Sequence, residues 1–179
     1  MNYANIKKHD VANGPGVRVS LFVSGCRHHC KECFNPETWN FNYGRAFTPS
    51  VMEELLNACD HEYIEGLTIL GGEPFEPENQ KTVLMVMQEF KKRFPEKSLW
   101  CYSGYTIDDL LKGELNTWHS QKKMTKDEHN TVLQMLGIID TLVDGEFKIE
   151  ERDLKLEFRG SRNQRLINVS EYIKEHGYR

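Results

Sequence analysis

Four short runs rich in apolar residues, each ending in a turn that contains glycine, constrain the fold of this chain most strongly. The runs cover residues 17–23, 67–70, 98–102 and 141–144. They stop at Ser24-Gly25, Gly71-Gly72, Ser103-Gly104 and Gly145. Glycine lets the chain leave a strand in conformations that other residues avoid, so we interpret these runs as strands. The run 67–70 is typical of a buried strand in a parallel sheet.

Helical patterns separate these runs. The predicted helices cover a segment from Ser50 to Cys59, residues 78–94, residues 106–111, residues 127–137 and the C-terminal end. Ser50 and Glu53 have the spacing of a capping box, and Thr106 and Ser170 are predicted caps of two other helices. Strands that alternate with helices predict an α/β fold with a mainly parallel sheet. We expect residues 1–179 to form a single domain, with a last strand at 165–169 and a polar loop or insertion near 113–130.

Composition excludes several classes of function. The 179 residues carry a net charge of −4, so we expect neither nucleic acid nor an anionic membrane as a partner. The N-terminus has no apolar signal region, and no run approaches the roughly 18 apolar residues of a membrane span. Five cysteines, three of them in one loop, argue against a disulfide framework and for metal or redox chemistry in the cytoplasm.

The clustered cysteines are Cys26, Cys30 and Cys33, with the spacing C-x3-C-x2-C. A four-iron cluster usually takes four thiolates, so three would leave one iron open for chemistry. The alternative is zinc, with His28 or His29 completing a Cys3His site. Both histidines lie between ligands within the loop, a position from which coordination is geometrically difficult, and this favours the iron–sulfur interpretation. Carboxyl ends of parallel strands gather at one edge, so we expect the unusual residues to share one site.

A second motif follows the second predicted strand and consists of Gly71, Gly72, Glu73 and Pro74. Together with the three cysteines in this order, it resembles the radical S-adenosylmethionine enzymes. The resemblance implies that the cysteines bind a [4Fe-4S] cluster, and that S-adenosylmethionine binds the open iron through its amino and carboxylate groups. It implies that the turn meets the methionyl amino group, with glycines that let the backbone approach. Gly72→Val is then expected to weaken cofactor binding and to leave the cluster in place.

Two further cofactor contacts follow from the same resemblance. The position before the third cysteine, often aromatic in this superfamily, is Glu32 here, and Phe34 follows Cys33. Either Phe34 stacks on the adenine or the adenine is held differently. Ser103, at the end of the third strand, is expected near the ribose, although it could also be a simple turn residue.

Three more segments resemble a narrower group. Residues 10–18, with Asn13-Gly14-Pro15-Gly16 and Arg18, are similar to the N-terminal motif of glycyl-radical activating enzymes. Residues 143–147 and 158–165 are similar to the activating proteins of anaerobic ribonucleoside-triphosphate reductases. The resemblance implies an enzyme that forms a glycyl radical on this reductase, with electrons from a flavodoxin-type donor. A closed TIM barrel takes about 250 residues, so we expect a partial, open β/α barrel whose open side accepts the protein substrate.

Other interpretations remain open at this stage. The chain could activate another glycyl-radical enzyme such as pyruvate formate-lyase, or act on a small molecule as the deazaguanine-forming synthase does. An iron–sulfur electron carrier or a zinc-binding module would explain the cysteines but not the Gly-Gly-Glu-Pro turn. Without the resemblance, residues 13–16 would be a simple turn and residues 159–165 a solvated basic loop. Cys59 and Cys101 are most simply core residues, and Asp144 is either a turn acid or a site residue.

Overall fold

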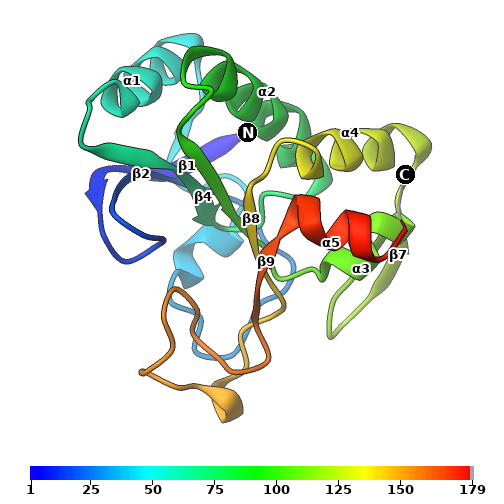
Figure 1. The fold of residues 1–179 in the computed structure, drawn as a ribbon. Coiled ribbons are helices and arrows are strands. Elements are labelled where there is room, and N and C mark those ends of the chain that lie inside the picture. The colour runs from blue at the N-terminus through cyan, green and yellow to red at the C-terminus, as the bar shows by residue number, and fades with distance from the viewer. Residues whose placement is uncertain (178–179) are drawn as a thin grey trace.

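The centre of the molecule is a seven-stranded sheet in the order β3-β1-β2-β4-β5-β8-β9 (Figure 1). A computed structural model describes residues 1–177. The strands are β1 (Asn2–Asp10), β2 (Val17–Val23), β3 (Arg45–Ala46), β4 (Ile64–Gly71), β5 (Ser98–Tyr102), β8 (Thr141–Asp144) and β9 (Arg165–Asn168). Strands β2, β4, β5 and β8 are parallel, and β1, β3 and β9 join antiparallel. The α/β class with parallel central strands is confirmed, and over the described residues the sheet does not close into a barrel.

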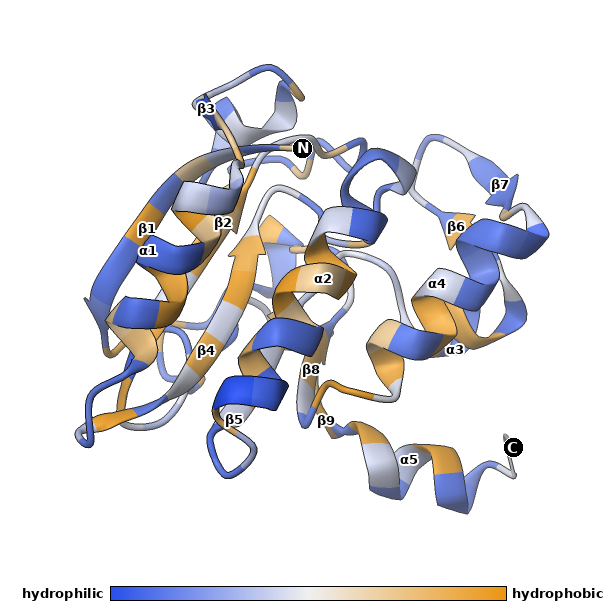
Figure 2. Ribbon diagram, turned by 90° about the horizontal axis from the view of Figure 1, so that it is seen from above, coloured by the Kyte–Doolittle hydropathy of each residue, from blue (hydrophilic) through white to orange (hydrophobic). Residues whose placement is uncertain are grey.

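Helices cover one face of this sheet (Figure 2). They are α1 (Pro49–Cys59), α2 (Pro77–Arg93), α3 (Ile107–Lys112), α4 (Lys126–Leu136) and α5 (Val169–Glu175), with short 3-10 turns η1 (Pro36–Trp39) and η2 (Ile149–Glu151). The apolar sides of α1, α2 and α4 pack on alternate residues of the central strands and exclude water from them. Cys59 and Cys101 are fully buried in this core, as predicted. No helix within residues 1–177 is long and apolar enough to cross a membrane.

Two predicted helix caps are wrong. Helix α1 is capped by Thr48, whose Oγ1 accepts a hydrogen bond from the Val51 N–H, and not by Ser50. Pro49 occupies the first turn, where its fixed φ favours a helix start and its missing N–H costs nothing. Helix α5 is capped by Asn168 instead of Ser170. The predicted cap of α3, Thr106, is confirmed.

Two strands and one loop also differ from the sequence-based prediction. Strand β1, not predicted, pairs antiparallel with β2, and β9 runs antiparallel to β8 because residues 145–164 contain no crossover helix, only η2. The segment 113–130 is not a plain loop. It forms a hairpin of β6 (Glu114–Asn116) and β7 (Gln121–Lys123) and then the first half of α4.

The motif at 13–18 stabilises the amino end of the sheet, away from the cysteine loop. Arg18 is fully buried and donates to Thr68 Oγ1 at 2.7 Å, Ser98 Oγ at 2.8 Å and the Leu67 and Ser98 carbonyls at 2.9 Å. Thr68 Oγ1 in turn donates to the Asn13 carbonyl. The Gly14 turn lies directly on the arginine, since a Cβ there would come within 2.7 Å of Arg18 Cδ. Arg18 therefore joins β2, β4 and β5 and holds the turn against them.

Arg18→Lys should lower the free energy of unfolding by about 2 kcal/mol, measured by denaturant titration, because hydrogen bonds to a charged donor stabilise by about 1.5–3 kcal/mol each. A lysine ammonium cannot reproduce the planar fork that reaches all three partner residues. The control is Arg93→Lys, whose guanidinium pairs with Glu53 at the surface and should change stability little. Equal losses of stability in Arg18→Lys and Arg93→Lys would contradict the role of Arg18 in joining the three strands.

Candidate active site

Two glycine turns at the carboxyl ends of β2 and β4 are bonded directly to each other. The Gly72 N–H donates to the Val23 carbonyl and the Glu73 N–H donates to the Gly25 carbonyl, both at 2.8 Å. A Cβ on Gly72 would lie 2.6 Å from the Gly25 oxygen. From the sequence, Gly72 was expected to let the backbone approach a ligand. The structure shows that glycine is required at this position for the contact between the two turns. Because Cys26 follows Gly25, the Gly-Gly-Glu-Pro turn and the cysteine loop form one unit.

Residues at the start of α2 also bind the Gly-Gly-Glu-Pro turn and the cysteine loop. Asn79 Nδ2 donates to the carbonyls of Ser24 and Glu73, one in each turn. The buried Glu76 carboxylate accepts from the backbone N–H and the guanidinium of Arg27, the residue after Cys26. Burial raises the pKa of Glu76. The start of the cysteine loop is therefore anchored at both its backbone and its side chain.

The cysteine loop carries three free thiols that are partly exposed. Two of its residues have positive φ, His29 at 51° and Glu32 at 59°. Burial raises the pKa of the Cys26 thiol, and raises that of Cys30 to about 11. A bound cation would reverse this and favour the thiolates. Cys33 Sγ already accepts a hydrogen bond from a backbone N–H at 3.4 Å.

The donor set fits an iron–sulfur cluster with one open iron. The loop offers three thiols, none of which forms a disulfide, and a backbone N–H donor to sulfur. Among residues 1–177, no three His, Cys, Asp or Glu side chains converge in metal-binding geometry, so the fit rests on the type and spacing of the ligands and not on convergence of the three thiols. His28 is held between Glu146 and Glu73, and His29 stacks on Trp39, which argues against the Cys3His zinc alternative.

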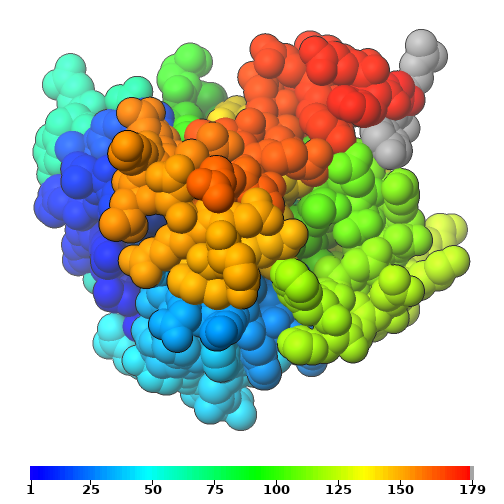
Figure 3. Space-filling model, turned by 90° about the horizontal axis from the view of Figure 1, so that it is seen from below, coloured from blue at the N-terminus to red at the C-terminus, as the bar shows by residue number. Residues whose placement is uncertain are grey.

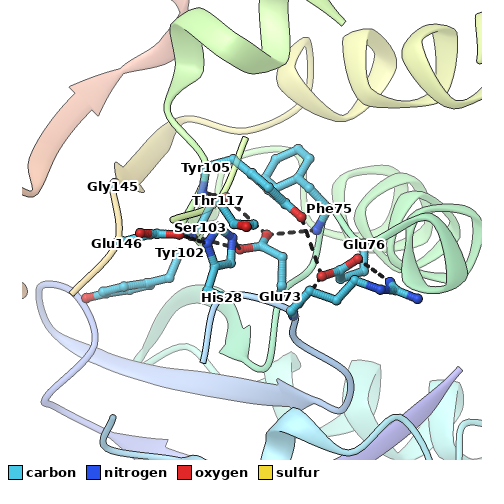
Figure 4. A network of polar contacts seen from close by, with 12 residues as sticks. His28, Glu73, Phe75, Glu76, Tyr102, Ser103, Tyr105, Thr117, Gly145 and Glu146 are labelled. Atoms are coloured by element: carbon cyan, nitrogen blue, oxygen red, sulfur yellow. Dashed lines mark hydrogen bonds and ion pairs between the residues drawn. The ribbon is translucent and has the colours of Figure 1, made fainter. Parts of the chain in front are cut away.

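His28, in the middle of the cysteine loop, is buried between two carboxylates (Figure 4). Its Nδ1 lies 2.5 Å from Glu146 Oε1, and its Nε2 lies 3.3 Å from Glu73 Oε2. Burial lowers the pKa of His28, but the neighbouring carboxylates of Glu146 and Glu73 outweigh this and raise it to about 9. His28 therefore links the cysteine loop to the ends of β4 and β8.

Glu73 is the most constrained acid of the site. Its carboxylate accepts from the Phe75 N–H at 3.0 Å, Ser103 Oγ at 3.0 Å and the Gly104 N–H at 2.7 Å (Figure 4). Ser103 Oγ also accepts from the Tyr105 N–H, so this hydroxyl is used in holding Glu73. The ends of β4 and β5 are thereby fixed to each other.

Phe34 lies apart from this network. Its side chain is 62% exposed and packs against the ring of Phe147 at 5.1 Å and the guanidinium of Arg152 at 5.8 Å. Figure 3 shows the cysteine loop, the segment 145–164 and the β6–β7 hairpin adjoining on one face. Between them lies a cavity of about 310 Å³ lined by Cys30, Trp118 and Phe147, among others. A second cavity, of about 380 Å³, adjoins the ends of β5 and β8.

The basic element at 159–165 is not a free solvated loop. Arg165 binds the buried Asp144 carboxylate at 2.6 Å, and the Asp144 carboxylate also accepts from the Ile107 N–H at the start of α3. Asn163 and Gln164 bind the two backbone carbonyls that follow Asp144. Asp144 is therefore a structural anchor for β8, β9 and α3.

Comparison with known proteins gives the family. The family described as a 4Fe-4S single cluster domain matches residues 12–167. The anaerobic ribonucleoside-triphosphate reductase-activating protein of Enterobacteria phage T4 is 36% identical over 176 residues, which is 98% of this chain and 99% of the phage protein. The proteins of that name from Vibrio cholerae and Haemophilus influenzae are 38% and 37% identical over 166 residues, 92% of this chain and 96% of each relative.

The chain belongs to the family of anaerobic ribonucleoside-triphosphate reductase-activating proteins. The part that matches the 4Fe-4S domain contains all three loop cysteines and the turn at 71–74. The buried pair of His28 and Glu146 in this member of the reductase-activating family is not predicted from the sequence. One signal could have found Glu146: it directly follows the end of β8, at the edge where the other parallel strands also end.

Proposed function

We propose that this chain is a radical S-adenosylmethionine enzyme that generates the glycyl radical of an anaerobic ribonucleoside-triphosphate reductase. One observation carries the proposal: in a member of this family, the cysteine loop and the Gly-Gly-Glu-Pro turn are bonded to each other at the strand ends. The alternative, an iron–sulfur electron carrier, would need no open iron beside such a turn. The names of the relatives supply the reductase as the protein substrate.

The residues have separate roles in this proposal. Cys26, Cys30 and Cys33 would hold a [4Fe-4S] cluster, and the turn at 71–74, with Ser103 and Phe34, would bind S-adenosylmethionine. When bound, these cofactors supply one electron and a 5′-deoxyadenosyl radical that takes a hydrogen atom from a glycine Cα, leaving methionine, 5′-deoxyadenosine and the glycyl radical. The chain itself orients the cofactors and excludes water and oxygen.

The open sheet suits a large substrate. We propose that it corresponds to part of a β/α barrel and that the reductase covers the uncovered side of the site. All five cysteines are free thiols, which suits a reducing compartment such as the cytoplasm. A flavodoxin-type protein would supply the electron.

The test follows the abstracted hydrogen. Reductase labelled with α-deuterated glycine should be mixed anaerobically with this protein, S-adenosylmethionine and a strong reductant. The 5′-deoxyadenosine should then carry one deuterium, measured by mass spectrometry, and a glycyl radical should appear on the reductase by EPR. Pyruvate formate-lyase in the same assay should give far less of both, since docking depends on surface contacts beyond the shared chemistry.

Cofactor cleavage without deuterium transfer and without a glycyl signal would exclude the activating role and leave the radical chemistry standing. A reduced cluster whose EPR spectrum does not change when S-adenosylmethionine is added would exclude the radical class itself. Equal activation of the two glycyl-radical enzymes would remove the assignment to the reductase.

A further inference from the structure

Three consecutive side chains of the 159–165 element hold three consecutive residues at the end of β8. Asn163 Nδ2 donates to the Glu146 carbonyl at 2.8 Å, and Gln164 Nε2 donates to the Gly145 carbonyl at 3.0 Å. Arg165 completes the set by binding the Asp144 carboxylate at 2.6 and 2.9 Å. We call Asn163, Gln164 and Arg165 the clamp.

The clamp also closes the loop from which it comes. Gln164 Oε1 accepts from the Gly160 N–H at 2.8 Å and the Ser161 N–H at 3.2 Å, while its Nε2 reaches across to Gly145. The side-chain amide of Gln164 therefore joins the start of the long β8–β9 connection to its end. Gly145 has a φ of 101°, so the chain turns sharply at the point where the clamp grips it.

The residue that the clamp places is Glu146. Its Oε1 accepts from His28 Nδ1 at 2.5 Å and from the Trp118 N–H at the tip of the β6–β7 hairpin at 3.2 Å. Figure 4 shows Glu146 pointing from the end of β8 towards His28. The side chains of His28 and Glu146 are 1% and 11% exposed, so their contact is largely shielded from water. His28 lies midway between Cys26 and Cys30.

The residue next to Glu146 makes a second connection to the cysteine loop. This residue, Phe147, lines the same cavity as Cys30. The ring of Phe147 packs on Phe34, which follows Cys33. The cysteine loop thus has its start anchored by Arg27 on Glu76, and it meets residues 146 and 147 through His28 and Phe34.

We infer that Glu146 is a positioning residue for the iron–sulfur cluster: it holds the cysteine loop through His28, and the clamp holds Glu146. The inference rests on the proposed function only for the presence of a cluster on the three cysteines. Groups that orient metal ligands typically change metal affinity by about 10–100-fold when they are removed. Removal of the Glu146 carboxylate is expected to weaken retention of the cluster by a similar factor.

The experiment measures how fast a chelator removes the cluster after anaerobic reconstitution, from the loss of its visible absorbance. Glu146→Ala should speed this loss about tenfold. Glu146→Gln keeps an oxygen that accepts from both His28 and Trp118, and should stay within about twofold of the wild type. The matched control is Glu157→Ala, an exposed acid of the same connection, which should not change the rate.

Two further variants separate positioning from general destabilisation. The effects of Glu146→Ala and His28→Ala on the rate should not add, because each removes the same contact. Gln164→Glu keeps the acceptor oxygens for Gly160 and Ser161 but has no N–H for Gly145, and should speed the loss severalfold.

A loss rate in Glu146→Ala equal to that of Glu157→Ala would overturn the inference, as would additive effects of the Glu146 and His28 variants. A wild-type chain that binds no iron would remove both this inference and the proposed function. A wild type that holds a cluster but does not activate the reductase would remove the proposed function alone, and the chelator rates would still decide the role of Glu146.

Discussion

Replacing Cys30 with alanine should remove the four-iron cluster from this protein and abolish glycyl-radical formation. Two thiolates cannot hold a cluster that needs at least three protein ligands when one iron is left open. The other two cysteines, Cys59 and Cys101, are fully buried in the core, so neither thiol can replace a lost ligand. Iron and sulfide analysis after anaerobic reconstitution should show the loss, and Cys26→Ala and Cys33→Ala should behave alike.

The matched control is Cys59→Ala. Cys59 is fully buried between α1 and the sheet, where it is a small core residue. Its replacement should cost about 1 kcal/mol of stability and leave the iron content unchanged. Full cluster content in Cys30→Ala would contradict the assignment of the ligands. Stoichiometric zinc without iron in the wild type would contradict the iron–sulfur assignment altogether.

Gly72→Val should damage both the fold and the cluster loop. Its Cβ would lie 2.6 Å from the Gly25 oxygen, and its three nearest atoms all belong to the Gly25 backbone, which has no flexible side chain to move away. We expect the free energy of unfolding to fall by about 3 kcal/mol, at the upper end of overpacking effects. Because Cys26 follows Gly25 directly, the iron content after reconstitution should fall as well.

This outcome differs from the expectation drawn from sequence, in which Gly72→Val affects only cofactor binding. The control is Gly137→Ala at the end of α4, where φ is −68° and a Cβ would meet its nearest atoms at an ordinary 3.5 Å. That variant should be neutral or slightly stabilising, by about 0.5 kcal/mol. Normal stability and iron content in Gly72→Val, with weakened binding of S-adenosylmethionine in calorimetry, would restore the original interpretation.

Local signals determined the order of the elements. The glycine turns after the strands and the helical spacing over 78–94 depend on neighbours in sequence, so β2, β4, β5, β8 and α2 lie where expected. The cysteine spacing and the Gly-Gly-Glu-Pro turn likewise indicated the chemistry without a fold, because ligand type and spacing are local. Helix starts were less certain, since Thr48 and Ser50 are both good caps and Pro49 decides between them.

Only the tertiary structure decided which residues meet. His28 and Glu146 are 118 positions apart, and nothing in either segment marks the other as its partner. Their contact exists because β2 and β8 end at the same edge of one sheet and the clamp fixes how far residue 146 extends from it. The antiparallel direction of β9 and the need for glycine at position 72 likewise arise from contacts between segments that are distant in sequence. Strand pairing and the approach of two backbones are properties of packed segments, and the sequence by itself determines only which segments are available to pack.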